Sequence, residues 1–183
     1  IEVVEVPAMA PRTKPKALTY ALAGARGKFL TIYDAEDRPH PQQLREAFHA
    51  FELGPPELAC LQAPLVIGNA GESWISAIFA LEYSALFRRL LPALGFYRLP
   101  LPLGGTSNHF RTALLKASGG WDPFNVTEDA DLGMRLCRMG YRASTLTLPT
   151  YEDAPTEFKV WLAQRTRWYK GWLQTWLVLM RRP

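Results

Sequence analysis

Cysteine is scarce in this chain, with only two among its 183 residues. Cys60 and Cys137 each lie inside an apolar run, and neither belongs to a metal-binding or redox spacing. The pattern excludes a small scaffold held together by disulfides, and it gives no functional signal. We expect both residues to be buried, reduced thiols of a protein in a cytoplasmic setting.

Long apolar runs are missing as well. None is long enough to span a bilayer, and no signal-peptide pattern opens the chain. With 48% hydrophobic and 21% charged residues, the composition is typical of one globular domain rather than of a disordered chain. The chain starts inside a strand-like segment, residues 1–6, and stops just after an aromatic-rich helix. We therefore expect residues 1–183 to form a single domain cut from a longer protein.

Neither sign of charge dominates, although the formal net charge is +4 and basic residues gather at 12–28 and 165–182. This balance suits phosphates, anionic lipid or nucleic acid about equally. No nucleic-acid recognition motif accompanies the basic residues, so we expect no nucleic-acid partner.

Acidic residues follow the first β-favouring run. Residues 28–33 form a continuous run that is apolar on both faces, which favours a strand inside a parallel sheet covered by helices. Asp34, Glu36 and Asp37 stand at its carboxyl end, the edge at which open α/β sheets bind ligands. A second buried strand is predicted over residues 58–67. The sequence thus predicts an α/β fold with a candidate site at a strand end.

Apolar periodicity predicts the helices. A helix after Pro39 and Pro41 should pack by one stripe, formed by Leu44, Ala47, Phe48 and Phe51. Further helices are predicted over residues 17–25, 73–91, 112–117 and 156–180, and a strand over 141–148.

A second acidic group stands where a helical periodicity begins, and it comprises Glu128, Asp129 and Asp131. Acidic side chains complement the dipole of a helix start, and Thr127 or Asn125 can supply the capping oxygen, so a structural explanation is sufficient. However, adjacent residues on a helix point about 100° apart, so Glu128 and Asp129 cannot both lie on the solvated face. We expect at least one of them to face a cleft.

Two other segments allow a functional or a structural interpretation. The glycines of residues 104–109 let a backbone approach a ligand closely, but Gly and Asn also mark plain turns. On the last predicted helix Gln164, Arg167 and Trp168 share one face, with Arg165 beside them. They could clamp a diphosphate and a sugar ring, although an ordinary solvated helix face explains them too.

Three motifs in this order resemble the processive-type family-2 glycosyltransferases, the group of cellulose synthase and bacterial polysaccharide synthases. They are Asp34-Ala35-Glu36-Asp37-Arg38-Pro39, Thr127-Glu128-Asp129, and Gln164-Arg165-Thr166-Arg167-Trp168, the last being the Gln-x-x-Arg-Trp signature. The resemblance covers essentially the whole chain and implies a GT-A fold, with a mostly parallel sheet flanked by helices. It also implies that the family's first strand-helix unit, and a uridine-contacting Asp after it, lie upstream of Ile1, so we expect this piece to bind its donor weakly.

The resemblance implies a role for each motif residue. Asp129 matches the catalytic base, with Glu128 beside it, and attack opposite the leaving group implies inversion. Asp34 and Glu36 match the metal-binding Asp-x-Asp positions and would hold Mg²⁺ or Mn²⁺, with Glu36 in place of the commoner Asp. The residues implied to bind the nucleotide sugar and its diphosphate are Lys14, Arg165 and Arg167. Those implied to meet the acceptor are Gly105, Thr106, Ser107, Asn108, Gln164 and Trp168.

We therefore expect a metal-dependent enzyme that transfers a sugar from a UDP-sugar to a glycan acceptor in polysaccharide synthesis. It would work at the cytoplasmic face of the bacterial inner membrane, as part of a longer membrane protein. The aromatic helix within residues 156–183 would lie in the membrane interface, unless its aromatics pack on the domain itself. Two alternatives stay open: a metal-dependent nucleotidyl or phosphoryl transferase, and a nonenzymatic basic module that binds nucleic acid or lipid.

Overall fold

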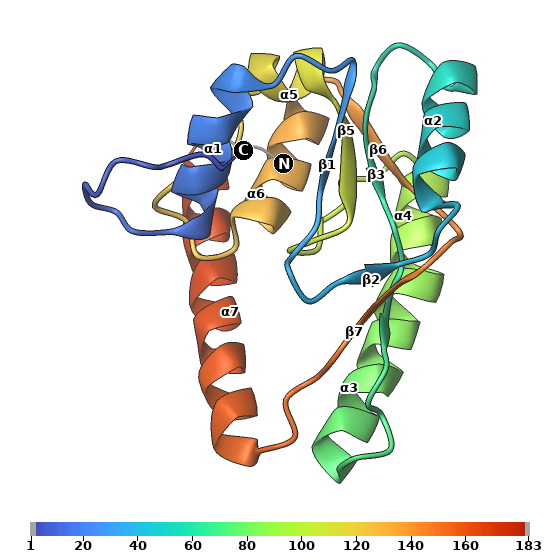
Figure 1. Ribbon diagram of the computed structural model, residues 1–183, viewed down its shortest axis with the longest axis vertical. Coiled ribbons are helices and arrows are strands. Elements are labelled where there is room, and N and C mark those ends of the chain that lie inside the picture. The colour runs from blue at the N-terminus through green and yellow to red at the C-terminus, as the bar shows by residue number, and fades with distance from the viewer. Residues whose placement is uncertain (1–2, 182–183) are drawn as a thin grey trace.

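The computed structural model describes residues 3–181 and has an α/β architecture in which mixed sheets are flanked by helices (Figure 1). The helices are α1 (Lys14–Gly24), α2 (Gln43–Leu53), α3 (Trp74–Ala85), α4 (Leu91–Phe96), α5 (Thr112–Ala117), α6 (Glu128–Arg138) and α7 (Phe158–Leu179). A π-helical segment, Leu86–Leu90, joins α3 to α4. The strands are β1 (Phe29–Ile32), β2 (Arg38–Pro39), β3 (Leu58–Gln62), β4 (Leu65–Ile67), β5 (Asn108–Arg111), β6 (Arg142–Thr145) and β7 (Thr150–Glu152).

The main sheet is mixed rather than mostly parallel. Its strand order is β1-β5-β3-β6, with β5 antiparallel to both β1 and β3, and β3 parallel to β6. The prediction that residues 28–33 lie inside a parallel sheet was wrong, because β1 is a half-buried edge strand whose one partner among residues 3–181 is the antiparallel β5. The ring of Phe29 in β1 stacks on that of Phe51 in α2, and the two ring centroids are 4.8 Å apart. Packing against α2 therefore explains an apolar residue in this strand without a second neighbouring strand.

The predicted strand over residues 58–67 is two strands in two sheets. After β3, the carbonyl of Pro64 accepts a hydrogen bond of 2.9 Å from Thr150 N, and the chain continues as β4. β4 runs parallel to β7, which pairs antiparallel with β2, so a small sheet of order β2-β7-β4 forms below the main one. This second sheet brings Glu152, the last residue of β7, near the acidic segment that follows β1.

Helices cover both faces of the main sheet. On one face Cys60 packs with Phe110, Leu91 and Leu132, and there α1, α5 and α6 lie together in Figure 1. On the other face α2 buries Ala47 and Phe51 against Leu58 and Leu61. The two cysteines are free thiols: Cys60 is buried as predicted, whereas Cys137 is half-buried.

The predicted stripe of α2 is only partly right. Ala47 and Phe51 are buried, but Leu44 and Phe48 are 57% and 50% exposed. Gln43 is buried in their place, because its amide binds the hydroxyl groups of Tyr33 and Thr150. A polar residue anchored by four side-chain hydrogen bonds therefore sets the rotation of this helix.

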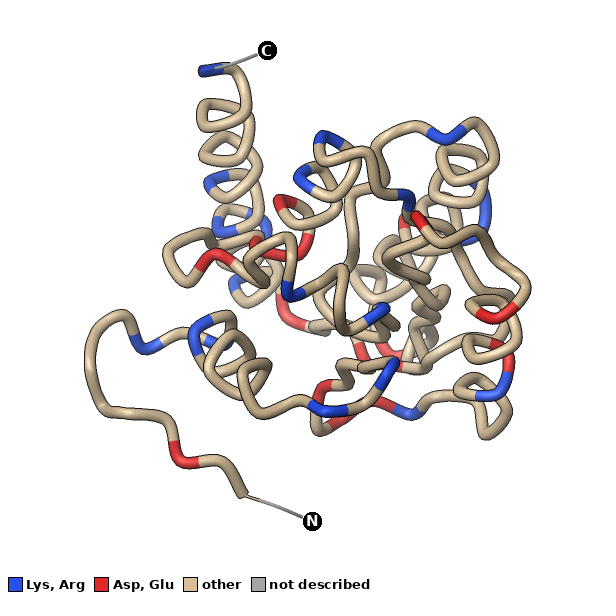
Figure 2. Tube along the Cα trace, turned by 90° about the horizontal axis from the view of Figure 1, so that it is seen from above, with Lys and Arg blue, Asp and Glu red and all other residues tan. Residues whose placement is uncertain are grey.

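The remaining helices lie close to their predicted positions, and Ser73 caps α3 through a reciprocal pair of hydrogen bonds with Ser76. Residues 3–6 form no strand, contrary to the prediction for 1–6, whose first two residues lie outside the described chain. Among residues 3–181 no helix is long and apolar enough to cross a membrane. Lys and Arg mark α7 and the helix after the N-terminal tail (Figure 2).

Candidate active site

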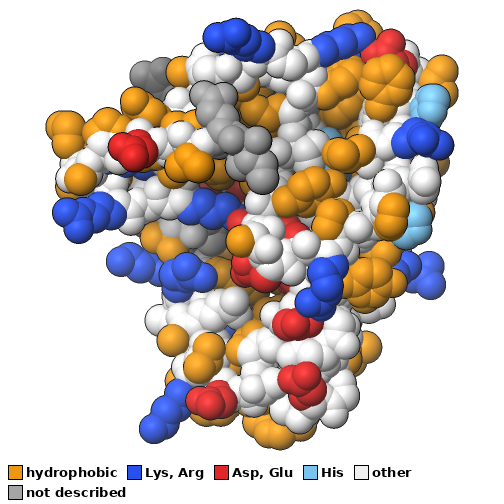
Figure 3. Space-filling model, in the orientation of Figure 1, with side chains coloured by type: hydrophobic (Ala, Val, Ile, Leu, Met, Phe, Trp, Pro, Cys, Tyr) orange, Lys and Arg blue, Asp and Glu red, His pale blue; other side chains and the backbone are white. Residues whose placement is uncertain are grey.

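Segments from four elements meet around Lys14, at the start of α1. Its ammonium forms an ion pair with Asp34, and it donates a hydrogen bond of 2.8 Å to the carbonyl of Gly105. Gly105 in turn lies against the start of α6, since a Cβ at this glycine would be 3.6 Å from Asp129 Oδ2. The end of β1, the loop before β5 and the start of the acidic helix thus meet around Lys14, and we call this region the acidic hollow. In Figure 3 acidic side chains gather near the middle of the face, between basic side chains.

Both acids at the start of α6 are buried. Glu128 is 7% exposed and Asp129 9%, so neither lies on a solvated face of the helix. Burial, followed by the charge of Glu128, raises the pKa of Asp129 to about 8, against the opposing charge of Lys14. Burial also raises the pKa of Glu128, and the charges of Lys14 and Arg167 oppose that shift. The first turn of α6 therefore holds a carboxyl group poised to exchange a proton near neutral pH.

The predicted cap of α6 was wrong in its geometry. The Thr127 side chain makes no capping bond, and Asn125 Oδ1 instead accepts a hydrogen bond of 3.0 Å from Thr127 N. Asp131 forms an ion pair of 2.7 Å with Arg135, one turn further along. Of the three acids in this turn, Asp131 is therefore structural, whereas Glu128 and Asp129 face the acidic hollow.

The acidic segment after β1 is tied to the loop before β5. Asp37 Oδ2 accepts hydrogen bonds from Asp34 N, at 2.8 Å, and from the Thr106 hydroxyl. The second oxygen of Asp37 is buried without a hydrogen-bond partner among the described residues. Glu36 is exposed, and Asp34 keeps about a third of its side chain exposed, so both can reach a ligand.

The predicted acceptor loop is mostly buried. Thr106, Ser107 and Asn108 are 3%, 0% and 2% exposed, and each hydrogen-bonds within the protein. Ser107 adopts a left-handed φ of 56°, a conformation that few residues other than glycine tolerate, and its hydroxyl donates to Thr150. These three side chains therefore hold the loop in place, and Gly105 beside them is exposed.

The two arginines of the motif on α7 lie in different surroundings. Arg167 is exposed and lies close enough to the acidic hollow to oppose the raised pKa of Glu128. Arg165 instead forms an ion pair with Glu82 of α3 and lies over the ring of Phe79. The prediction that Arg165 binds a diphosphate therefore conflicts with its position, because its guanidinium is already held by α3.

Trp168 lies at the contact with α3, and Gln164 precedes it by one turn of the same helix. The Trp168 ring lies 5.9 Å from that of Phe79, and the side-chain oxygen of Gln164 is buried without a hydrogen-bond partner among the described residues. A buried amide oxygen without a partner is uncommon in folded proteins.

Two residues of the hollow were missed in the sequence. Glu152 accepts a hydrogen bond from the Tyr83 hydroxyl, and burial together with the charge of Asp37 raises the pKa of Glu152 to about 7. Burial and the charge of Glu152 raise the pKa of Tyr83 above its ordinary value. The rule that located Asp34, a carboxylate at a strand end, would have found Glu152 if a strand as short as β7 were predictable.

Carboxylate oxygens are the ligands that Mg²⁺ and Mn²⁺ prefer. The described residues contain no ready-made group of three His, Cys, Asp or Glu side chains that could hold a metal ion. Asp34 and Glu36 supply suitable oxygens in the acidic hollow, and Asp37 of the same segment keeps a buried oxygen without a partner among the described residues. Such a donor set fits a metal whose other ligands come from a bound diphosphate.

Residues 29–183 match the model of the family described as glycosyl transferase family group 2. The chain belongs to this family. The resemblance drawn from the three motifs is thereby confirmed, and the chain is a glycosyltransferase domain. It is 27% identical over 176 residues to the probable glycosyltransferase YdaM of Bacillus subtilis, which covers 92% of this chain. It is 26% identical over 144 residues to the probable glucomannan 4-beta-mannosyltransferase 1 of Arabidopsis thaliana, which covers 78% of this chain.

The chain spans 40% of the length of YdaM and 26% of that of the plant mannosyltransferase. Among solved structures, it is similar to the mannosyltransferase PcManGT of Pyrobaculum calidifontis, in complex with GDP-Man and Mn²⁺, with a TM-score of 0.69 and 22% identity. That match covers 94% of this chain and 45% of PcManGT. Glucosyl-3-phosphoglycerate synthase of Mycobacterium tuberculosis, with Mn²⁺ and UDP-glucose, gives a TM-score of 0.54 at 18% identity, over 93% of this chain and 56% of that chain. These likenesses confirm the predicted GT-A fold.

Proposed function

We propose that this domain transfers a sugar from a nucleotide sugar to a glycan acceptor, with inversion and with a divalent metal, in polysaccharide synthesis. One observation carries the proposal: Asp34 and Asp129, from motifs far apart in the sequence, lie on either side of the contact between Lys14 and Gly105. Relatives named as mannosyltransferases, and similar structures bound to GDP-Man or UDP-glucose with Mn²⁺, support the reaction class. Both GDP-sugars and UDP-sugars are therefore candidate donors.

Asp129 is suited to act as the base that deprotonates the acceptor hydroxyl. In its ionised form the carboxylate takes the proton of the acceptor hydroxyl while that oxygen attacks the anomeric carbon from the face opposite the diphosphate. The bond between the anomeric carbon and the diphosphate oxygen breaks, and the nucleoside diphosphate leaves with the electron pair, so the configuration inverts. A buried carboxylate with a pKa of about 8 accepts a proton more readily than an exposed one. Glu128 contributes by keeping that pKa raised.

The leaving diphosphate needs positive charge around it. Asp34 and Glu36 would hold Mg²⁺ or Mn²⁺, which neutralises the diphosphate when bound. Arg167 and Lys14 supply cations from two different helices, the first from α7 and the second from α1. Gln164 and Trp168 would line the acceptor side.

The full-length protein would work at the cytoplasmic face of a membrane, with the second half of α7 in the interface. Trp172 and Trp176 are 40% and 57% exposed, so both rings present surface to the outside of the domain. Leu173 and Leu177 are exposed beside them, and the exposed Arg181 follows. Exposed aromatic and aliphatic side chains next to a cation are typical of helices that lie on a bilayer.

The test uses the full-length protein with GDP-mannose or UDP-glucose, Mn²⁺, and mannotetraose or cellotetraose as acceptor probes. We expect release of free GDP or UDP that requires Mn²⁺, and a product of inverted configuration by NMR. Asp34→Asn should lower this release about 100-fold, whereas Asp153→Asn, which changes an exposed acid paired with Arg38, should leave it unchanged. Release of pyrophosphate instead of the nucleoside diphosphate would identify a nucleotidyl transferase and refute the proposal.

A further inference from the structure

Arg165 is enclosed where α7 meets α3. Its guanidinium carbon lies 4.6 Å from the centre of the Phe79 ring, 5.0 Å from that of Trp168 and 5.5 Å from that of Trp161. An ion pair with Glu82 completes the enclosure, and only 20% of the arginine side chain is exposed. We call these five residues the arginine cage.

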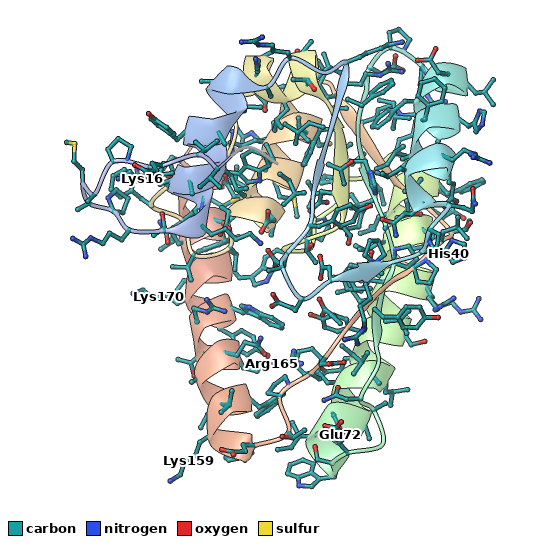
Figure 4. All side chains as sticks on the ribbon, in the orientation of Figure 1. Lys16, His40, Glu72, Lys159, Arg165 and Lys170 are labelled. Carbon is teal, nitrogen blue, oxygen red and sulfur yellow. The ribbon has the colours of Figure 1, made fainter. Side chains whose placement is uncertain are left out.

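The direction of Arg165 differs from that of other cations on the same helix. Figure 4 shows Arg165 reaching from α7 toward α3, whereas Lys159 and Lys170 point away from α3. Nε of Arg165 is buried without a hydrogen-bond partner among the described residues, so the charge is held by ring faces and one carboxylate. A diphosphate in the acidic hollow cannot take this guanidinium without breaking those contacts.

Stacked rings extend the cage toward the N-terminal ends of both helices. Trp161 stacks on Phe158, with centroids 5.6 Å apart, and Phe158 stacks on Trp74 of α3 at 6.5 Å. Together with the cage these contacts fasten the first half of α7 to α3. The placement of α7 therefore depends on side chains rather than on a backbone ladder.

The cage also adjoins the acidic hollow. Trp168 belongs to the cage itself, and Arg167 lies two residues from Arg165 on the same helix. On the α3 side, the Phe79 ring lies 4.8 Å from that of Tyr83, whose hydroxyl binds Glu152. A shift of Arg165 would therefore move the acceptor-side tryptophan and one wall of the hollow together.

We propose that Arg165 is a positioning residue, which sets Trp168 and Arg167 against α3 and does not bind the diphosphate. The inference rests on the proposed function of the hollow. It also explains why arginine stands here: a planar guanidinium covers several ring faces while keeping its carboxylate partner. A lysine would keep a charge for a diphosphate but could not fill the cage.

The experiment compares Arg165→Lys, Arg165→Met and Glu82→Gln in the full-length protein. Arg88→Lys, at an exposed arginine of the π-helical segment, is the matched control. Three quantities are measured: affinity for GDP and UDP with Mn²⁺, the ratio of sugar transfer to donor hydrolysis, and amide hydrogen exchange over residues 158–168. The ratio matters because a loss of folded protein lowers transfer and hydrolysis equally, whereas a misplaced acceptor side lowers transfer alone.

We expect both Arg165 variants to keep nucleotide affinity within about twofold and to lose about tenfold in the transfer ratio. Exchange over 158–168 should quicken about fivefold in both, less in Glu82→Gln, and not in the control. The inference is overturned if Arg165→Met weakens nucleotide binding about tenfold while Arg165→Lys transfers normally, or if exchange and ratio stay as in the wild type. If the wild type transfers from neither donor, the proposed function fails, and the exchange result alone supports or overturns the cage.

Discussion

The acidic hollow and the arginine cage lie side by side, and they differ in how far their charges are balanced. In the hollow, carboxylates outnumber the cations that face them, and burial raises the pKa of Asp129 and of Glu152. In the cage one cation is matched by one carboxylate and covered by rings. Uncompensated buried charge is costly, so it is typical of a site that binds a counter-charge or moves a proton. Matched and covered charge is typical of a structural contact.

The comparison separates two arginines of one motif. Arg165 and Arg167 are two residues apart on α7, yet the first belongs to the cage and the second faces the hollow. Residues of one sequence motif therefore need not share one role. The predictions below test the division, from the largest expected effect to the smallest.

Asp129→Asn should remove the base and lower sugar transfer about 10³-fold. Affinity for GDP or UDP with Mn²⁺ should change little, because the change affects proton transfer rather than donor binding. Transfer is measured as nucleoside diphosphate release with and without acceptor, and Asp153→Asn serves as the control. Transfer at the wild-type rate would show that Asp129 is not the base.

The pH dependence should follow from the raised pKa of Asp129, which is about 8 in the free protein. The base works when ionised, so kcat/KM should rise with pH below 8 and level off above it, by about 50-fold between pH 6 and pH 8. Rates are measured at constant ionic strength with Mn²⁺ in excess. A profile that stays flat across this range would mean that no group with such a pKa takes the proton.

Arg167→Met should weaken binding of GDP or UDP with Mn²⁺ about tenfold, since a cation facing the diphosphate is lost. Arg165→Met, measured by the same titration calorimetry, should differ from the wild type by less than about twofold. Equal losses of nucleotide affinity in the two variants would contradict the different roles proposed for Arg165 and Arg167.

Glu152→Gln should stabilise the metal-free protein by about 1 kcal/mol at pH 8. The raised pKa, about 7, means that the folded protein keeps a proton that the unfolded chain loses above its ordinary pKa of 4.5. Stability is therefore lost as pH rises from about 4.5 to about 7, and the amide avoids this loss. Urea unfolding at pH 8 and pH 4 checks the prediction, because the two proteins should be equally stable at pH 4.

Glu82→Gln should have the smallest effect, a loss of less than about 0.5 kcal/mol of unfolding free energy. The Glu82 side chain is 45% exposed, so solvent screens its ion pair with Arg165. A thermal unfolding midpoint far below that of the wild type would show that the carboxylate, rather than ring stacking, holds the cage.

Local patterns predicted the helices and the site residues that lie at element ends. The acidic start of α6, the length of α7 and the strand end at Asp34 could all be read from neighbouring residues. The meeting of Asp34, Asp129, Lys14 and Arg167 was then inferred from family order, which the geometry supports.

Pairings between distant residues could not be read in this way. The antiparallel pairing of Phe29 with Arg111 joins strands that are far apart in the chain, and nothing in either strand specifies its neighbour. The same holds for Arg165, whose partners Phe79 and Glu82 belong to α3. The side chain looked like a free cation in the sequence, because only the packing of two helices shows where its charge is held.

The most direct test of the acidic hollow is amide hydrogen exchange of the full-length protein with Mn²⁺ and either GDP or UDP. If one hollow binds the diphosphate, exchange should slow together over residues 34–37, 127–131 and 165–168, the three motif segments. Protection confined to one of these segments, or absent from all three at saturating nucleotide, would contradict a shared site.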